Sequence, residues 1–284
     1  MMKKSLAMAA GIVAITGTAF ATQPIPDDNF DALTIADLAG QNSWDQSGAA
    51  SSPNVGVVAG SLTYTGYSTV ATGNKVFLSD AGQDVGKSFA ATLPVADGNT
   101  YYYSFLLQHD GTDTGSTTGD YLAHFTGGIL ASGTAFRGRL FLGQDTVATS
   151  AKVGIRWGSA DAVVYGSTAI PQNTTALIVL KLTEVPSTIP TGTAGNDRAD
   201  VFVFLDPAPI PAVEPGTPTV STTNGALNSN QDIADTGGAI GRIGFRQGNA
   251  ANGAKVNVDF ARVGTTWAEV TSPASGIANW SAFE

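Results

Sequence analysis

The sequence contains no cysteine and only two histidines, His109 and His124. The lack of cysteine excludes disulfide bonds, thiolate metal sites and cysteine nucleophiles. Two histidines without cysteine also argue against a zinc site, because zinc in proteins is held mainly by these two residue types. We therefore expect the fold to be stabilised by burial of apolar side chains and by hydrogen bonds between strands.

Charge is scarce as well, since 13% of the residues are charged and the formal net charge is −9. Proteins that bind nucleic acids or anionic membranes concentrate Lys and Arg, so this acidic chain is not expected to bind either partner. With so few charges, the surface is expected to consist largely of Thr, Ser, Asn and Gly.

Glutamate is nearly absent, which bears on catalysis. Glycoside hydrolysis requires two carboxylates on either side of the scissile bond. None of the glutamates belongs to an acidic array on a predicted strand, and the aspartates lie mostly at turn positions. A secreted glycoside hydrolase is therefore the weakest of three functional hypotheses. The four glutamates are Glu184, Glu214, Glu269 and Glu284.

Serine-type catalysis has no clear sequence support either, because the chain lacks a Gly-x-Ser-x-Gly motif. His109 ends a predicted strand and His124 lies within another, and both positions are typical of structural histidines. A catalytic triad is defined by a geometry that sequence alone does not display. On balance the sequence predicts a protein that is not an enzyme.

The N-terminus has the pattern of a secretory signal peptide. Met1–Lys4 is basic, Leu6–Ile15 is apolar, and Ala19–Ala21 provides the small residues that signal peptidase requires. We predict that residues 1–21 are removed before Thr22, and hence a secreted bacterial protein, extracellular or at the cell surface. The apolar run is shorter than the roughly 20 residues of a spanning helix, and no later run reaches that length.

Nearly every apolar segment is short, alternating or β-branched, and is bounded by Gly, Asn, Asp or Pro. This pattern predicts an all-β fold, a two-sheet antiparallel β-sandwich of the jelly-roll type. A helix is expected only near Asp31–Leu38. The predicted strands are Val55–Val58, Lys75–Ser79, Ser88–Leu93, Thr100–Gln108, Tyr121–Phe125, Phe136–Leu142, Lys152–Trp157, Ala162–Tyr165, Ala176–Leu182, Asp200–Leu205, Ile240–Arg246 and Lys255–Val263.

The mature chain is expected to form one domain. Residues 22–53 are predicted to be an extended arm or a first strand, and residues 54–270 to be the sandwich. Residues 206–235 form a proline-rich insertion, and prolines there restrict the backbone and block strand pairing. A connection of this length usually has a function of its own or is disordered. Residues 271–284 are predicted to be a C-terminal tail.

Two aromatic residues are candidates for ligand binding. In Thr100–Gln108 the strand period of two places Tyr101, Tyr103 and Phe105 on one face, which we expect to be the core. Tyr102 then points to the other face, where sugar rings stack in many β-sandwiches, and Trp157 is the second candidate. The alternative for Tyr102 is a structural role at the rim of the sheet.

Calcium is the metal that the sequence favours. The stretch HDGTDTGSTTGD contains Asp110, Asp113 and Asp120 in one glycine-rich loop, and Asn196–Asp200 is a second oxygen-rich stretch. Calcium takes several oxygen ligands from flexible loops. Neither stretch matches a defined calcium motif, and Asp or Asn beside Gly is also common in turns. We keep the three aspartates as candidate calcium ligands.

Four segments together resemble a family of secreted bacterial laminin-G-like, concanavalin-A-like jelly-roll domains, over about Asn54–Val270. The resemblance implies the sandwich fold and supplies no agreed catalytic residues. Members often carry a C-terminal hydrophobic anchor, whereas GIANWSAFE has none, which favours release or retention through protein contacts. The four segments are VNVDFARVGTTWAEV, LPVADGNTYYYSFLLQ, ADVFVFLDPAP and AIGRIGFRQGNA.

The closing segment also has a physical interpretation. Val256, Val258 and Phe260 alternate and are expected to face the core. Trp267 is expected to fold back over the open end of the core and to contribute through packing. Asp259 and Arg262 are expected to form a structural polar pair.

The leading functional hypothesis is a non-catalytic protein with an adhesive or structural role at the cell surface or in the extracellular matrix. Its expected partners are copies of itself or other surface proteins, through sheet edges or the arm TQPIPDDNFD. The alternative is a lectin-like module that binds glycans, with or without calcium.

Overall fold

The computed structural model describes residues 23–48, 50–68, 71–93, 98–110, 116–127, 136–147, 149–157, 161–184, 197–223 and 240–273. This part of the chain contains fifteen β-strands and one five-residue α-helix. The helix in this part of the chain is neither long nor apolar enough to cross a bilayer.

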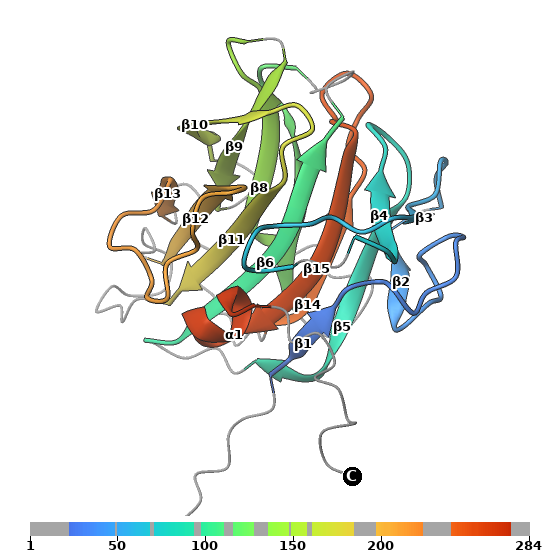
Figure 1. Cartoon of the computed structure of the whole chain (residues 1–284), viewed down its shortest axis with the longest axis horizontal. Coiled ribbons are helices and arrows are strands. Elements are labelled where there is room, and N and C mark those ends of the chain that lie inside the picture. Colours follow the sequence, from blue (N-terminus) through green and yellow to red (C-terminus); the bar gives the residue numbers. More distant parts are fainter. Residues whose placement is uncertain are drawn as a thin grey trace, which may run out of the picture.

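The strands form two antiparallel sheets that lie face to face (Figure 1). In sheet A the order is β13 (Val220–Thr223), β12 (Arg198–Leu205), β11 (Ala176–Thr183), β6 (Thr100–His109), β15 (Val256–Gly264), β4 (Asn74–Leu78) and β3 (Gly56–Ala59), and β1 (Ile25–Asp28) also pairs with β15. In sheet B it is β10 (Val164–Pro171), β9 (Ser150–Arg156), β8 (Phe136–Gln144), β7 (Asp120–Gly127), β14 (Ile240–Arg246), β5 (Asp84–Leu93) and β2 (Trp44–Ser47). The predicted all-β, two-sheet antiparallel sandwich is confirmed.

Each of the twelve predicted strands overlaps an observed one, although β10 begins and ends later than predicted. The expected helix near Asp31–Leu38 is wrong, because these residues form turns and bends. Three observed strands, all short and polar, are not among the twelve predicted ranges: β1, β2 and β13. β1 lies in the segment 22–53, which was predicted to be an extended arm or a first strand. The extended conformation of the three strands comes from pairing with β15, β5 and β12 and not from their own composition. β13 lies within the proline-rich insertion.

The polar strand β1 is held by one buried carboxylate. Asp28 is 3% exposed and accepts hydrogen bonds from Trp44 Nε1 at 2.8 Å and from Lys87 Nζ at 2.7 Å. A buried charge is tolerated when it is paired and hydrogen-bonded in this way. Residues inside the predicted segment 22–53 are thus bound to both sheets, since Asp28 belongs to β1 and Trp44 to β2.

The main core fills the space between the sheets. Tyr101, Tyr103 and Phe105 all point into it, as the strand period predicted. Phe245 lies at its centre, with its ring centroid 5.3 Å from that of Trp44 and 5.5 Å from that of Phe105. Offset and edge-on aromatic contacts of this kind add to the stabilisation from burial.

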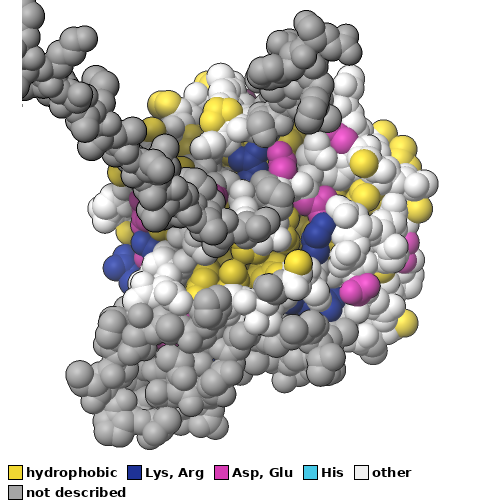
Figure 2. Space-filling view, turned by 90° about the horizontal axis from the view of Figure 1, so that it is seen from below, with side chains coloured by type: hydrophobic (Ala, Val, Ile, Leu, Met, Phe, Trp, Pro, Cys, Tyr) yellow, Lys and Arg dark blue, Asp and Glu magenta, His cyan; other side chains and the backbone are white. Residues whose placement is uncertain are grey.

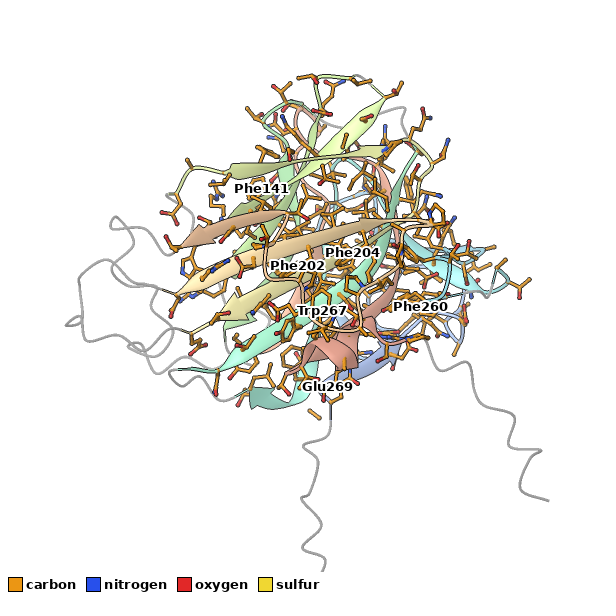
Figure 3. The ribbon with its side chains drawn as sticks, turned by 60° about the vertical axis from the view of Figure 1, so that its left-hand side comes forward. Phe141, Phe202, Phe204, Phe260, Trp267 and Glu269 are labelled. Atoms are coloured by element: carbon orange, nitrogen blue, oxygen red, sulfur yellow. The ribbon has the colours of Figure 1, made fainter. Side chains whose placement is uncertain are left out.

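A second apolar cluster lies on the outer face of sheet A, beneath the helix α1 (Trp267–Thr271) and the proline-rich segment. Phe202, Phe204 and Trp267 gather there (Figure 3). Trp267 is 6% exposed and donates from Nε1 to the carbonyl of Pro211 at 2.9 Å. The packing role of Trp267 was predicted, but the position was wrong, because Trp267 covers the outer face of sheet A and not an open end of the core.

The closing strand changes face along its length. Val256 and Val258 point into the core as predicted, whereas Phe260 packs in the second cluster. The register of β15 against β6 shifts between Asp259 and Arg262, and Phe260 has a φ of 52°. A β-bulge adds a residue and so reverses the alternation, which explains why Phe260 departs from the predicted pattern.

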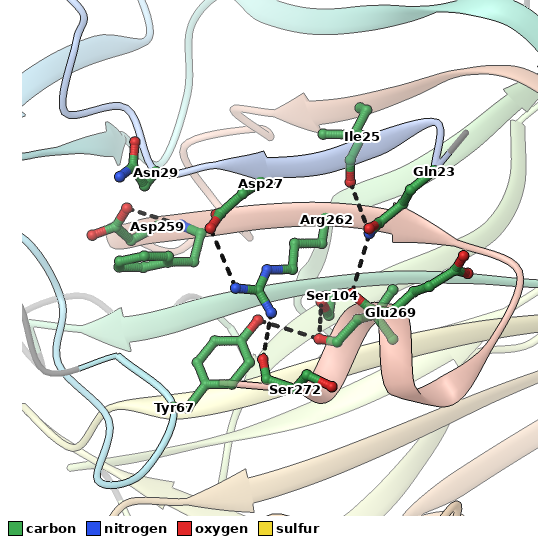
Figure 4. Close-up of polar contacts among 12 residues, drawn as sticks. Gln23, Ile25, Asp27, Asn29, Tyr67, Ser104, Asp259, Arg262, Glu269 and Ser272 are labelled. Atoms are coloured by element: carbon green, nitrogen blue, oxygen red, sulfur yellow. Dashed lines mark hydrogen bonds and ion pairs between the residues drawn. The ribbon is translucent and has the colours of Figure 1, made fainter. Parts of the chain in front are cut away.

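Asp259 and Arg262 do not pair with each other, contrary to the prediction. The Asp259 carboxylate accepts from the backbone N–H of Leu62 at 2.9 Å and of Phe260 at 2.8 Å. Arg262 reaches Asp27 at 3.3 Å and donates to the carbonyl of Ser272 at 2.6 Å (Figure 4). Arg262 thus fastens β1 and the end of α1 to sheet A, whereas Asp259 holds the segment at Leu62 and the bulge at Phe260.

Candidate functional site

The outer face of sheet B carries a layer of basic and aromatic side chains, which we call the cation–aromatic face. Its residues alternate along the strands with core residues such as Leu140, Val153 and Ile243, so the strand period directs them away from the core. The members are Tyr121 and His124 of β7, Phe136, Arg139 and Phe141 of β8, Lys152 and Arg156 of β9, Tyr165 of β10, and Arg242 and Arg246 of β14. This one face thus holds five of the 14 Lys and Arg residues of an acidic chain.

The basic groups of this face lie over aromatic rings. Two guanidinium groups contact the Tyr121 ring, with Arg246 Cζ at 4.3 Å and Arg139 Cζ at 5.0 Å from its centroid. Arg156 Cζ lies 4.9 Å from the centroid of Phe141. Contacts of this kind attract the cation to the negative face of the ring and fix the orientation of the guanidinium plane.

Two further contacts belong to this face. Lys152 Nζ lies 5.3 Å from the ring centroid of Tyr165, and the rings of His124 and Phe136 are 4.4 Å apart. Tyr121, Phe136 and Tyr165 are partly exposed, whereas His124 lies buried against the sheet. The layer therefore has a buried floor and partly exposed rings above it.

Glycines in the strands allow this layer to lie close to the backbone. Gly86 lies beneath Arg242, Gly244 beneath His124, and a Cβ atom at Gly154 would be 2.7 Å from the ring of Tyr165. At each of these positions a side chain would displace the group above it. The flat arrangement of the layer thus depends on the absence of side chains beneath it.

The charges on this face are unequally neutralised. Arg246 contacts Asp120 at 2.7 Å and Asp84 at 3.5 Å, and Arg242 donates to two backbone carbonyls. Arg139 and Arg156 contact no carboxylate in the described part of the chain, and the Nε atom of each is buried without a hydrogen-bond partner there. Positive charge is therefore in excess around β8 and β9.

Burial and this excess charge shift the pKa values of the face. Burial lowers the pKa of Arg139, and Arg156 and Arg246 lower it further. Burial, assisted by Arg139, Arg246 and Arg242, lowers the pKa of His124 to about 3. His124 is therefore neutral at physiological pH and adds no charge to the face.

The two predicted ligand-binding aromatics are both buried. Tyr102 is 6% exposed beneath the proline-rich segment, and its hydroxyl donates to Glu214 at 2.6 Å. The ring of Trp267 lies edge-on to it at 6.2 Å. Trp157 is fully buried in the main core. In this structure neither ring offers a face on which a sugar can stack.

Two of the three predicted calcium ligands, Asp110 and Asp120, lie among the described residues. Asp113 lies outside the described residues. Asp120 is engaged, because it contacts Arg246 at 2.7 Å and accepts from the backbone N–H of Asn249 at 3.0 Å. Asp110 lies immediately after β6. Among the described residues no group of three or more His, Cys, Asp or Glu side chains is arranged to hold a metal ion.

The cation–aromatic face was not predicted from the sequence, although the spacing of some of its residues is consistent with a shared face. Arg139 and Phe141 are two residues apart, and Lys152 and Arg156 are four apart, as are Arg242 and Arg246. Even spacing within a strand places both residues of a pair on the same face. What the sequence does not show is that these strands are neighbours in one sheet.

An apolar pocket of about 460 Å³ lies beside α1, between Pro209 and Pro211 on one side and Ala268 and Pro273 on the other. Seen from below, apolar side chains gather in the middle of the molecular surface, with basic and acidic side chains around them (Figure 2). Val213, next to the pocket lining, is 77% exposed.

No protein-family model and no curated protein sequence matches this chain. Among solved structures, peanut lectin with a nine-residue peptide is 10% identical, with a TM-score of 0.44 over 82% of this chain and 95% of that one. The globular domain of T. cruzi calreticulin is 12% identical, with a TM-score of 0.41 over 84% and 89%. Alginate lyase vAL-1 from Chlorella virus is 9% identical, with a TM-score of 0.42 over 82% and 99%. Likeness at this level says nothing about ligand or activity.

Proposed function

We propose that this chain is a non-catalytic extracellular binding protein that attaches to polysaccharide through the cation–aromatic face. The observation that carries the proposal is the presence of two partly exposed rings, Phe136 and Tyr165, among hydrogen-bond donors on one sheet face. Tyr121 supports this surface by contacting the guanidinium groups of Arg139 and Arg246. The C–H faces of sugar rings pack on aromatic rings, and Arg and Lys donate hydrogen bonds to sugar oxygens. This surface is formed by hydrogen-bonded neighbouring strands of sheet B.

The carboxylates of this face favour binding over hydrolysis. Among the described residues, the two carboxylates that form ion pairs on this face, Asp84 and Asp120, both pair with Arg246. A glycosidase needs one carboxyl group free to donate a proton and a second one across the bond. Two of the glutamates serve the fold, because Glu214 accepts from Tyr102 and Glu269 caps α1.

The wider role that we propose is adhesion at the bacterial cell surface or in the extracellular matrix, with the cation–aromatic face as the adhesive surface. The proposal includes secretion through residues 1–21, a laminin-G-like relationship over Asn54–Val270, and assembly with copies of the chain. Exposed apolar groups near α1, such as Val213, support contact between copies.

A polysaccharide array probed with the purified full chain tests the proposal. We expect binding that is lost in Tyr165→Ala, which removes a partly exposed ring, and kept in Phe77→Ala, which removes a partly exposed ring from sheet A. Circular dichroism and thermal unfolding establish that both variants are folded. Absence of binding to every polysaccharide, or equal binding by the two variants, would overturn the proposal.

A further inference from the structure

We infer that the polysaccharide bound by the cation–aromatic face is anionic, with carboxylate or sulfate groups along its chain. This inference rests on the proposed function, because it assigns a ligand class to the same face. Its basis is the arrangement of Arg139, Arg156 and Lys152 on strands β8 and β9.

Arg139 and Arg156 are direct partners in the pairing of β8 with β9, so their side chains leave the sheet side by side. Like charges directly opposite each other on two strands destabilise a sheet. No described carboxylate lies between them, and the buried Nε atom of each lacks a hydrogen-bond acceptor. An anionic group at the solvent-facing side of the two guanidinium groups would supply the missing negative charge.

The chemistry of arginine favours an oxyanion as that group. A guanidinium group donates two parallel hydrogen bonds to a carboxylate, and it matches phosphate-like oxyanions such as sulfate in the same way. Arg139 contacts the rings of Tyr121 and Phe136, both at 5.0 Å, and Arg156 contacts Phe141 at 4.9 Å. These stacking contacts keep the two guanidinium planes oriented before any ligand binds, which lowers the entropy cost of binding.

The spread of the cations favours a polymer over a small anion. Lys152 and Arg156 lie four residues apart on β9, which corresponds to about 13 Å along an extended strand. A single small anion contacts one of these two groups, whereas a chain with repeated charges contacts both at once. Avidity of this kind strengthens binding without new types of contact.

Nucleic acid is the competing polyanion, and the overall charge disfavours it. DNA has a charge every 1.7 Å along its axis, and binding it requires many Lys and Arg residues. The net charge of −9 repels such a dense polyanion, whereas the local cations still attract a polysaccharide with sparser charge.

Titration calorimetry of the full chain with alginate, dextran sulfate, neutral dextran and double-stranded DNA tests the inference. We expect alginate or dextran sulfate to bind at least about tenfold more tightly than dextran and DNA, which corresponds to one charge-assisted hydrogen bond. The arms with alginate and dextran sulfate distinguish carboxylate from sulfate as the recognised group.

Charge-removing variants locate the site. Arg156→Gln and Lys152→Gln each remove a partly exposed cation that has no ion pair among the described residues, so both are expected to fold. Each is expected to weaken binding of the anionic polymer by about tenfold and to reduce its salt dependence. Arg198→Gln is the control, since it removes the same charge, together with an ion pair to Asp200, from sheet A, and should bind like the wild type.

The possible failures are distinguishable. Binding of neutral dextran as tight as that of the anionic polymers, and lost in Tyr165→Ala, would overturn this inference and leave the proposed function intact. Absence of binding to any polysaccharide would overturn both. Tightest binding to DNA, or equal losses in Arg156→Gln and Arg198→Gln, would overturn the inference.

Discussion

The hydroxyl of Tyr102 donates a hydrogen bond to Glu214 at 2.6 Å and thereby connects the centre of sheet A to the proline-rich segment 112 residues further on. Lys181 Nζ binds the other oxygen of the same carboxylate at 2.6 Å. Two strands of sheet A thus hold the proline-rich segment at a single glutamate.

Removing the Tyr102 hydroxyl is expected to destabilise the protein. Tyr102→Phe should lower the free energy of unfolding by about 1–2 kcal/mol, because the hydroxyl donates to a partly buried carboxylate. Urea denaturation measures the change. A double-mutant cycle with Glu214→Gln should show that the two effects are not additive, and simple additivity would contradict direct coupling.

Trp267 is expected to contribute far more to stability. Trp267→Ala removes a ring that contacts Tyr102, Phe202 and Phe204, and should cost about 3–5 kcal/mol. Because Trp267 lies on sheet A, polysaccharide binding at a temperature where the variant is still folded should be unchanged. A large loss of affinity in the folded variant would contradict the assignment of the site to sheet B.

The buried histidine predicts a loss of stability in acid. The pKa of His124 is about 3 in the folded protein and about 6.5 in an unfolded chain. Folding therefore excludes a proton, and this contribution is complete above pH 6.5 and declines as the pH falls towards 3, by up to about 1.4 kcal/mol per pH unit. Measuring the free energy of unfolding from pH 7 to pH 4 tests this.

Three of the described carboxyl groups act in the opposite direction over the same range, because burial raises the pKa of Asp27, of Asp84 and, to about 8, of Asp259. Burial raises the pKa of Asp84 to about 6, so its contribution is present below pH 3.8 and is lost as the pH rises towards 6. The variant His124→Phe, whose ring does not titrate, isolates the histidine. Its stability should fall less in acid than that of the wild type, and an unchanged pH dependence would show that His124 is not responsible.

Calcium is not expected to be required at the cation–aromatic face. Asp120, the candidate ligand nearest to this face, is already engaged by Arg246 and by the backbone of Asn249. Polysaccharide binding should therefore survive EDTA, whereas Asp120→Asn should weaken the positioning of Arg246 with or without calcium. Loss of binding in EDTA that is restored by added calcium would contradict this expectation.

The strand period of two predicted much of the fold, because most strands have one face in the core. It placed Tyr103 and Phe105 correctly, and it failed at Phe260, where a bulge adds a residue. The ranges of β1 and β2 were not predicted, and a first strand within residues 22–53 was only an alternative to an extended arm, because the extended conformation of β1 and β2 comes from neighbours distant in sequence.

The candidate site was harder to predict than the fold. Tyr102 does point away from the core, but segments remote in sequence cover the outer face of sheet A, and no local pattern reveals such a cover. Arg139 and Arg246, in contrast, belong to the candidate site but were not predicted as site residues. Each has a polar side chain that any surface strand would tolerate, and only the order of strands in sheet B brings both to the ring of Tyr121.

The glycines beneath the cation–aromatic face are uncharged positions at which a substitution would disturb this face. A single added methyl group at Gly244 would lift the His124 ring, and with it Phe136, which is in contact with both His124 and Arg139. Every ionic group would survive such a change, yet the guanidinium planes would no longer be aligned. The proposed recognition at this surface is therefore expected to depend on the smallest residues of the sheet as well as on its largest side chains.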